Sequence, residues 1–209
     1  MSALAPLLIR YFAAQFRQPR GIVGRLLIGP WLDRIAVGMN RLVLSELDLR
    51  PGDKVLEIGF GGGGLLAAML EAGARPLGAD ISSAMVSRAR HRFGERVELH
   101  EASVEKLPLA DGSAEKAASV STIYFWPDPE AAAAEVARVL RPGGLLAIAF
   151  EPPEELRKWP GHRFGFRAWE EREVRALLAG AGFGRFRVAE GSGRKPDRFL
   201  CLTAERLEG

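Results

Sequence analysis

The sequence predicts an α/β fold built on a seven-stranded, mostly parallel sheet with helices on both faces and a helical extension at the N-terminus. Three observations predict it. From residue 55 onward, short apolar runs alternate with helical patterns, as is typical of parallel sheets covered on both sides. Only residues 190–197 separate the last two apolar runs, so the last strand is expected to be antiparallel, because a parallel crossover needs a dozen or more residues. The length of 209 residues suits one such domain with a short appendage.

The N-terminal quarter is predicted to be helical. Apolar residues recur there at steps of three and four, which places them on one helix face. The first such stripe comprises Leu4, Leu7, Leu8, Tyr11, Phe12 and Phe16, and a second runs from Trp31 to Leu47. Pro19 breaks the pattern between them, and residues 19–25, with two glycines, are expected to form a hinge. We therefore predict a helical cap or lid at residues 1–48 over a domain at residues 49–209.

The alternating part of the chain supplies the sheet and its helices in order. Strands are expected at residues 55–58, 76–79, 97–100, 116–120, 144–150, 185–189 and 199–203. Helices are expected at residues 65–72, 84–93, 130–140 and 170–179. The turn at residues 51–53, Pro-Gly-Asp, separates the helical extension from the first strand.

The composition excludes several classes of protein. Hydrophobic residues make up 47% of the chain, which supports a packed core, and a net charge of +3 is too mild for a histone-like or ribosomal tail protein. Cys201 is the single cysteine, so we expect no internal disulfide and a reducing, cytoplasmic location. Three scattered histidines do not indicate a metal site. No targeting signal or membrane-spanning run is apparent in the sequence.

A glycine-rich turn follows the first predicted strand, in the segment VLEIGFGGGG at residues 55–64. Glycine allows a tight turn and lets a ligand approach the main chain, and the start of the next helix offers free N–H groups to an anionic group. Gly59, Gly61 and Gly64 also fit the dinucleotide-binding pattern, so the turn alone is compatible with either NAD or S-adenosylmethionine (SAM).

Nearby carboxylates favour SAM over NAD. Glu57, two residues before the first glycine, suits a ligand that carries an ammonium and a sulfonium and would repel a pyrophosphate. Asp80, at the end of the next strand, suits the ribose hydroxyls of either cofactor. The sheet also uses up the chain, which leaves no second domain for the substrate of a hydride transfer.

Four motifs in this order carry a family resemblance: VLEIGFGGGG, GADISSAM, VEKLPLADGSAEKA and VLRPGGLLAI. Together they cover about residues 50–204 and resemble the class I SAM-dependent methyltransferases, with the small-molecule enzymes of ubiquinone and menaquinone biosynthesis the most similar group. The fold of that family is a doubly wound seven-stranded sheet with an antiparallel last strand, which agrees with the predicted elements. The resemblance implies methyl transfer from SAM to an oxygen, nitrogen or carbon atom of a small-molecule acceptor.

The resemblance also implies which residues contact the methionine part of SAM. Glu57 matches the motif acid near the methionine end, and Gly59, Gly61 and Gly63 match the glycines beneath the ligand. Ser121 follows the fourth predicted strand, where family members place backbone near the amino-acid part of SAM.

A second set of positions matches those that contact the adenosine part. Asp80 matches the ribose carboxylate, Ile81 the residue packed on adenine, and Ser103 and Val104 the adenine-contact segment. Many relatives have Asp at the position of Ser103. Met85 either lines the same pocket or belongs to the core.

Three residues are candidates for the acceptor side. Tyr124 either stacks on an aromatic acceptor or the sulfonium, or caps the core. His162 lies in a loop flanked by Gly and Pro, as a general base or as a solvated loop histidine. Glu151, directly after an apolar strand, is a second candidate base or a ligand for an acceptor amine.

The charge is concentrated in the N-terminal segment. Residues 1–50 carry seven arginines and three acidic residues, whereas the remainder has a net charge of −1. A basic cap predicts an acidic or polar-headed acceptor, or peripheral contact of the first helix with an anionic membrane, more than it predicts nucleic acid. The alternatives are methylation of RNA or protein, an NAD-dependent oxidoreductase, and a non-catalytic SAM- or lipid-binding domain.

Overall fold

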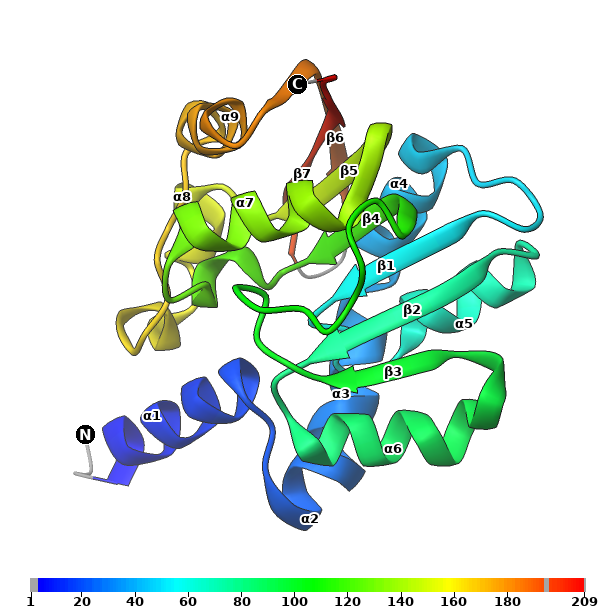
Figure 1. The fold of residues 1–209 in the computed structure, drawn as a ribbon. Coiled ribbons are helices and arrows are strands. Elements are labelled where there is room, and N and C mark those ends of the chain that lie inside the picture. The colour runs from blue at the N-terminus through cyan, green and yellow to red at the C-terminus, as the bar shows by residue number, and fades with distance from the viewer. Residues whose placement is uncertain (1–3, 194–195, 209) are drawn as a thin grey trace.

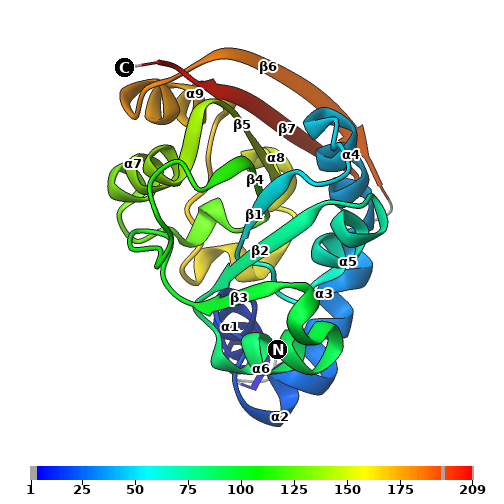
Figure 2. The ribbon, with the colours of Figure 1, turned by 45° about the vertical axis from the view of Figure 1, so that its right-hand side comes forward.

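A computed structural model describes residues 4–193 and 196–208, and in them the chain forms a seven-stranded sheet of order β3-β2-β1-β4-β5-β7-β6 (Figure 1). The strands are β1 (Lys54–Ile58), β2 (Arg75–Asp80), β3 (Glu98–Glu101), β4 (Ala114–Val120), β5 (Leu140–Phe150), β6 (Phe183–Ser192) and β7 (Arg198–Arg206). β1 to β5 pair in parallel, and β7 is antiparallel to both β5 and β6. Both the parallel sheet and the antiparallel last strand are thus confirmed. β3 and β6 are the two edges of the sheet (Figure 2).

Helices cover both faces of the sheet, as predicted. The α-helices are α1 (Leu4–Arg17), α2 (Gly21–Val23), α3 (Gly29–Ile35), α4 (Val37–Leu47), α5 (Gly64–Glu71), α6 (Ser83–Phe93), α7 (Pro129–Val139), α8 (Pro153–Leu156) and α9 (Glu171–Gly180). Short turns of other helix types are η1 (Gly24–Ile28, π), η2 (Gly94–Arg96), η3 (Ile123–Phe125) and η4 (Pro160–Arg163). α4 and α5 lie on one face of the sheet, and α7 and α9 lie on the other (Figure 1). In the described ranges, none of these helices has the length and apolarity required to cross a bilayer.

Consecutive residues of β1 show how the sheet is buried on both faces. Val55 packs with Met39 and Leu65 beneath α4 and α5, whereas Leu56 belongs to the cluster that includes Val136 of α7. Because side chains alternate along a strand, a strand covered on both faces reads as a continuous apolar run. This is why short apolar runs were sufficient to locate the strands.

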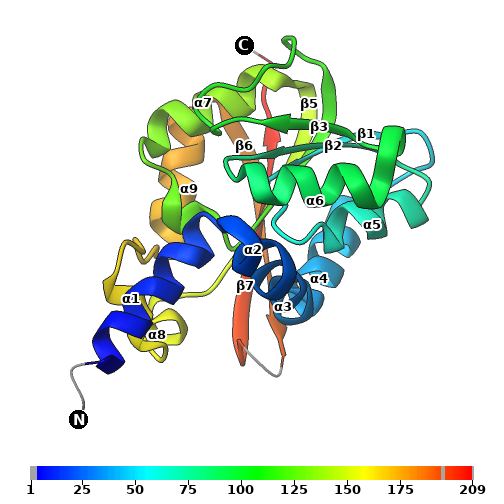
Figure 3. The ribbon, with the colours of Figure 1, turned by 90° about the horizontal axis from the view of Figure 1, so that it is seen from below.

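Of the N-terminal helices, α1 and α3 lie at the carboxyl ends of the strands, whereas α4 lies on one face of the sheet. α4 packs on β5, β6 and β7, while α1 extends beside the segment of α8 and η4 (Figure 3). Phe16 connects these parts, since its ring stacks on that of Trp31 with centroids 4.7 Å apart and lies 5.1 Å from the ring of Trp159. Aromatic packing thus fixes α1 over the edge of the sheet where β1, β2 and β4 end.

Several local predictions differ from the structure, and three of them have a clear form. The expected hinge at residues 19–25 is mostly helical, because the N–H of Gly24 donates a hydrogen bond to the carbonyl of Arg20. Gly24 also packs directly on Pro19, so there is no room for a side chain at this position. β5 begins at Leu140 instead of residue 144, since the Pro-Gly-Gly segment joins the sheet through a register shift opposite Ala114. β6 is longer than predicted at both ends.

Some predicted features lie outside what the structure describes. Residues 194 and 195, in the connection between β6 and β7, are among them, as are residues 1–3 of the predicted cap. The side chains of Leu4 and Arg25 also lie outside the description.

Candidate active site

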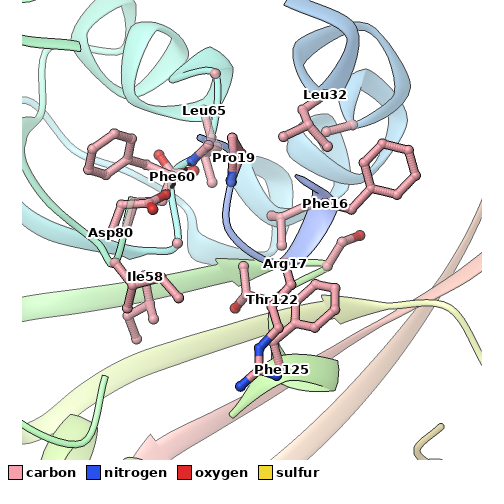
Figure 4. Close-up of a pocket in the computed structure, with 18 of the residues that line it drawn as sticks. Phe16, Arg17, Pro19, Leu32, Ile58, Phe60, Leu65, Asp80, Thr122 and Phe125 are labelled. Atoms are coloured by element: carbon pink, nitrogen blue, oxygen red, sulfur yellow. Dashed lines mark hydrogen bonds between the residues drawn. The ribbon is translucent and has the colours of Figure 1, made fainter. Parts of the chain in front are cut away.

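A cavity lies where β1, β2 and β4 end, covered by α3 and by the chain around the end of α1 (Figure 4). Asp80 and Phe60 lie on one side of it, and Phe125 lies on the other beside Arg17 (Figure 4). Its lining contains nine of the residues that the sequence predicts for the site, namely Glu57, Gly59, Gly61, Asp80, Ile81, Ser103, Val104, Ser121 and Glu151. Parallel strands end at one edge of a sheet, which is why motifs far apart in the sequence meet here.

The glycine turn forms the floor of the cavity, and Gly59 and Gly61 are the clearest examples of its need for glycine. Gly59 has φ +69°, and a Cβ atom there would lie 2.5 Å from Cγ2 of Thr122. Gly61 has φ +50°, in the left-handed region that residues with a side chain rarely adopt. The turn therefore presents bare backbone to a ligand.

Asp80 is held rigidly by two backbone groups. Its Oδ1 accepts a hydrogen bond from the N–H of Ser82 at 2.8 Å, and its Oδ2 accepts one from the N–H of Gly61 at 2.9 Å. The residue is 7% exposed, and burial raises the pKa of Asp80 to about 6 despite these two hydrogen bonds. Each carboxylate oxygen has further acceptor capacity, so Asp80 is prepared to accept hydrogen bonds from a diol.

Glu57 is buried with one oxygen unsatisfied. The residue is 4% exposed, and its Oε2 atom has no hydrogen-bond partner among the described residues. Burial, followed by the charges of Asp80 and Asp33, raises the pKa of Glu57 well above its ordinary value. Leaving a buried carboxyl oxygen without a partner is unfavourable, and a cationic ligand in the cavity would relieve that cost.

Three residues lie toward the other end of the cavity. Ile81 is exposed and Val104 is buried, and both line the cavity. The hydroxyl of Ser103 donates to the carboxylate of Glu105, which leaves the hydroxyl oxygen free to accept a hydrogen bond from an amine. Met85 belongs to the core cluster with Phe93 and is absent from the lining, in agreement with the core interpretation.

Ser121 has a strained backbone at the edge of the cavity. Its φ of +54° is unusual for a residue with a side chain. The strain is held by a 2.9 Å hydrogen bond from its N–H to the carbonyl of Ala149 and by a contact of its hydroxyl with the sulfur of Met39 at 3.1 Å. Such strained residues are concentrated at functional sites.

Of the three candidates for the acceptor side, Glu151 is the one that lines the cavity. Burial, followed by the charge of Glu155, raises the pKa of Glu151 to about 7. A carboxyl group with a pKa close to physiological pH is suited to accept a proton.

Tyr124 and His162 lie elsewhere. Tyr124 is buried in the core against Phe125 and Phe166, and its hydroxyl accepts a hydrogen bond from the N–H of Glu151. His162 lies in η4, where its Nδ1 is 2.7 Å from the carbonyl oxygen of Trp159. Neither residue lines the cavity: Tyr124 is buried in the core, and His162 is partly buried in η4.

Gly63 is also absent from the lining. It is the N-cap of α5 with φ +83°, and a Cβ atom there would lie 2.9 Å from the ring of Phe93. The structure thus shows a packing requirement for glycine at this position.

Sequence reasoning missed Asp33. This residue comes from α3, lines the cavity, and accepts a hydrogen bond from the N–H of Gly64. A side chain at Gly62 would overlap the carboxylate of Asp33. No local pattern signals this contact, because the two segments are separated by the whole of α4 and β1. Phe16 and Arg17 from α1 and Trp126 from the segment after β4 also line the cavity.

Comparisons with known proteins identify the family. Residues 56–148 match the family described as methyltransferase domain. The uncharacterized methyltransferase YdaC of Bacillus subtilis (strain 168) is 30% identical over 172 residues, which are 80% of this chain and 91% of that protein. The methyltransferase GfsG of Streptomyces halstedii is 36% identical over 117 residues, which are 53% of this chain and 42% of that protein. The chain therefore spans most of the first relative and less than half of the second.

Solved structures share the fold. A chain from the complex of the Haloferax volcanii Trm112 methyltransferase activator with a methyltransferase has a TM-score of 0.80 at 20% identity, covering 87% of this chain and 94% of that chain. A SAM-dependent methyltransferase from Aquifex aeolicus has a TM-score of 0.69 at 24% identity, covering 86% and 97% respectively. The sequence match to YdaC extends over most of both proteins, and the motifs, sheet order and cavity agree with it. This chain belongs to the class I SAM-dependent methyltransferases, and its cofactor is S-adenosylmethionine.

Proposed function

We propose that the enzyme methylates a small-molecule acceptor, which binds between the cofactor and the N-terminal helices (residues 4–47). The observation that carries this proposal is the cover over the cavity. Phe16 and Arg17 of α1 and Leu32 of α3 line the same cavity as the glycine turn and Asp80 (Figure 4). A covered cavity at the carboxyl ends of the strands is suited to a small acceptor and hinders access by a folded RNA or protein.

The residues of the cavity fit SAM. The unsatisfied oxygen of Glu57 supplies an anionic partner for the positively charged amino-acid end, and Asp80 supplies acceptors for the ribose hydroxyls. Gly59 and Gly61 leave room for the ligand, while Ile81 and Ser103 are available to the adenine. A dinucleotide fits less well, because its pyrophosphate would face these carboxylates.

Bound SAM supplies an electrophilic methyl group for in-line displacement by the acceptor. The protein then has to orient the acceptor, exclude water and, where the acceptor is an O–H or N–H group, remove its proton. Glu151 is the residue we propose for the last task. The N–H of Glu151 is bonded to the Tyr124 hydroxyl, so Tyr124 is proposed to position Glu151 from the core. A catalytic role for His162 remains a prediction from the sequence.

Two measurements test this proposal. Calorimetry is expected to show binding of SAM and S-adenosylhomocysteine and no binding of NADH. A screen of small acceptors, with release of S-adenosylhomocysteine as the readout, is then expected to identify a substrate. If the enzyme methylates RNA or a protein and no small molecule, the acceptor class proposed here is wrong. If SAM does not bind at millimolar concentration, the assignment of the cavity fails.

We also propose peripheral contact with an anionic membrane. An N-terminal apolar surface is exposed on α1, η1 and α3, and it adjoins a shallow groove that Arg34 also lines. The surface consists of Leu7, Leu8, Phe12, Leu26, Leu27 and Trp31. Exposed apolar side chains beside arginines suit an anionic bilayer surface.

Sedimentation with vesicles tests the membrane contact. The protein is expected to bind vesicles of phosphatidylglycerol more than those of phosphatidylcholine, and the double variant Leu26→Ser, Leu27→Ser is expected to lose this binding. Absence of binding, or burial of the surface in a stable dimer, would contradict it.

The buried thiol of Cys201 is compatible with the proposed cytoplasmic location.

A further inference from the structure

We propose that Asp33, on α3, is a further cofactor-binding residue, and that its carboxylate pairs with the ammonium of the amino-acid part of SAM. The inference rests on the assignment of this cavity to SAM. It makes the N-terminal segment a component of the cofactor site in addition to a cover over the acceptor.

The contact between α3 and the glycine turn is too close to be incidental. At Gly62 an added side chain would overlap both the carboxylate of Asp33 and the carbonyl of Gly29. The N–H of Gly64, at the start of α5, donates to the Asp33 carboxylate. The glycine run thus accommodates an acidic side chain from another element.

Asp33 has partners on its outer side. Its Oδ2 atom lies 3.6 Å from the guanidinium of Arg88 and 3.7 Å from that of Arg92, and its side chain is 23% exposed. Nevertheless, burial outweighs these arginines and raises the pKa of Asp33. The two arginines therefore do not fully offset the cost of burying this carboxylate.

The cavity is strongly acidic at this end. Asp33 and Asp80 both raise the pKa of Glu57, so the three carboxyl groups are close enough to interact. Glu57 is 4% exposed, and its Oε2 atom, in a cavity-lining residue, meets no hydrogen-bond donor in the described part of the chain. Of the described residues that line the cavity, Arg17 alone carries a permanent positive charge.

Three neighbouring carboxyl groups favour binding of a cation, and SAM carries two positive groups, an ammonium and a sulfonium. Asp80 accepts two backbone N–H groups and is assigned to the ribose, whereas Glu57 has an unused oxygen and Asp33 contacts the turn at Gly62 and Gly64. An ammonium between Glu57 and Asp33 would donate a hydrogen bond to the unpartnered oxygen of Glu57. It would also balance the remaining negative charge of the Asp33 carboxylate. Binding of the cofactor would then also hold α3 on the turn.

A rival explanation is that Asp33 merely fastens α3 to α6 through Arg88 and Arg92. The two explanations differ in their dependence on the ligand. If Asp33 only fastens α3, its substitution would change the affinity for all adenosine ligands equally. If it is an ammonium partner, its substitution would change the affinity only for ligands that carry the ammonium.

Calorimetry with two proteins and three ligands separates them. The ligands are S-adenosylhomocysteine, its deaminated analogue, which retains the carboxylate, and 5′-methylthioadenosine, which lacks the amino-acid part. In the wild type, loss of the ammonium is expected to weaken binding on the order of tenfold or more. The Asp33→Asn variant preserves the hydrogen-bond acceptor for Gly64. In this variant, loss of the ammonium is expected to weaken binding much less than in the wild type, and 5′-methylthioadenosine is expected to bind with wild-type affinity.

Arg92→Gln is the matched control, because it removes a fastening partner of Asp33 and leaves the carboxylate in place. Its effect is expected to be similar for the three ligands. The proposal is overturned if wild-type affinity does not depend on the ammonium, a result that needs no variant to fold. Equal weakening of all three ligands by Asp33→Asn would also overturn it in favour of the fastening role. If the wild type binds none of them, the SAM assignment itself fails, which is a separate outcome.

Discussion

The backbone N–H of Gly61 donates a 2.9 Å hydrogen bond to Oδ2 of Asp80, and this bond ties the glycine turn after β1 to the end of β2. The two segments that face the proposed amino-acid and ribose parts of SAM are thus held as one unit before any ligand arrives. Preorganisation of this kind reduces the ordering cost of binding.

Replacement of Asp80 by Asn is expected to weaken SAM binding by roughly 1–3 kcal/mol, because charge-assisted hydrogen bonds to the ribose would be lost. Calorimetry measures this directly. Asp111→Asn is a suitable control, since the Asp111 side chain is 80% exposed and does not line the cavity. Unchanged affinity in Asp80→Asn would remove the role assigned to this residue.

The shifted pKa of Asp80 also predicts how the free energy of unfolding depends on pH. Its pKa of about 6 in the folded protein exceeds the ordinary value of 3.8, so the native state binds the proton more tightly than the unfolded state. The contribution of Asp80 to stability is therefore greatest below pH 4 and is lost as pH rises through about 6, by about 3 kcal/mol. Burial of Glu57 acts in the same direction. Urea unfolding at pH 4.5 and pH 7 should show most of this loss, about 2 kcal/mol, in the wild type and a smaller one in Asp80→Asn, and equal losses would contradict the prediction.

Glu151→Gln is expected to lower kcat by about 10²–10⁴-fold if the acceptor must lose a proton. In the wild type, kcat/KM should rise with pH through about 7, where the Glu151 carboxyl group ionises, and the variant should lack this rise. Glu154→Gln, an exposed neighbour, should behave like the wild type. A retained pH profile in Glu151→Gln would exclude Glu151 as the base.

Gly62→Ala is expected to displace α3 from the glycine turn, because the new methyl group would overlap Asp33. The expected result is a loss of SAM affinity of at least about tenfold, together with faster hydrogen exchange in α3. Gly180→Ala is the control, since the space around that helical glycine is open. Normal affinity in Gly62→Ala would show that α3 does not need to be seated for the cofactor to bind.

Phe16→Ala is expected to loosen α1, because the ring of Phe16 stacks on Trp31 and contacts Trp159. The loss of aromatic packing should raise the KM of the acceptor more than that of SAM and increase hydrogen exchange in α1. Deletion of residues 1–30 should reduce turnover sharply for the same reason. Full activity of either variant would contradict the proposed cover over the acceptor.

The sequence by itself was sufficient for the sheet and for one side of the site. Strands buried on both faces leave short apolar runs, and the glycine turn and Asp80 follow such runs directly, so Glu57, Gly59 and Gly61 could be placed from local pattern and family motif. The sequence pattern placed the start of β5 at residue 144 instead of Leu140. Pro and Gly usually indicate a turn, whereas here they join β5 through a register shift.

Only the tertiary structure decided which side chains share the cavity. Tyr124 and Glu151 both follow apolar strands, yet packing buries the ring of Tyr124 and leaves the carboxyl group of Glu151 in the lining. The contact of Asp33 with Gly62 forms only because α3 folds back over the ends of β1 and β2. Motifs and periodicity report short-range constraints along the chain, whereas burial and long-range contacts depend on how distant segments pack together.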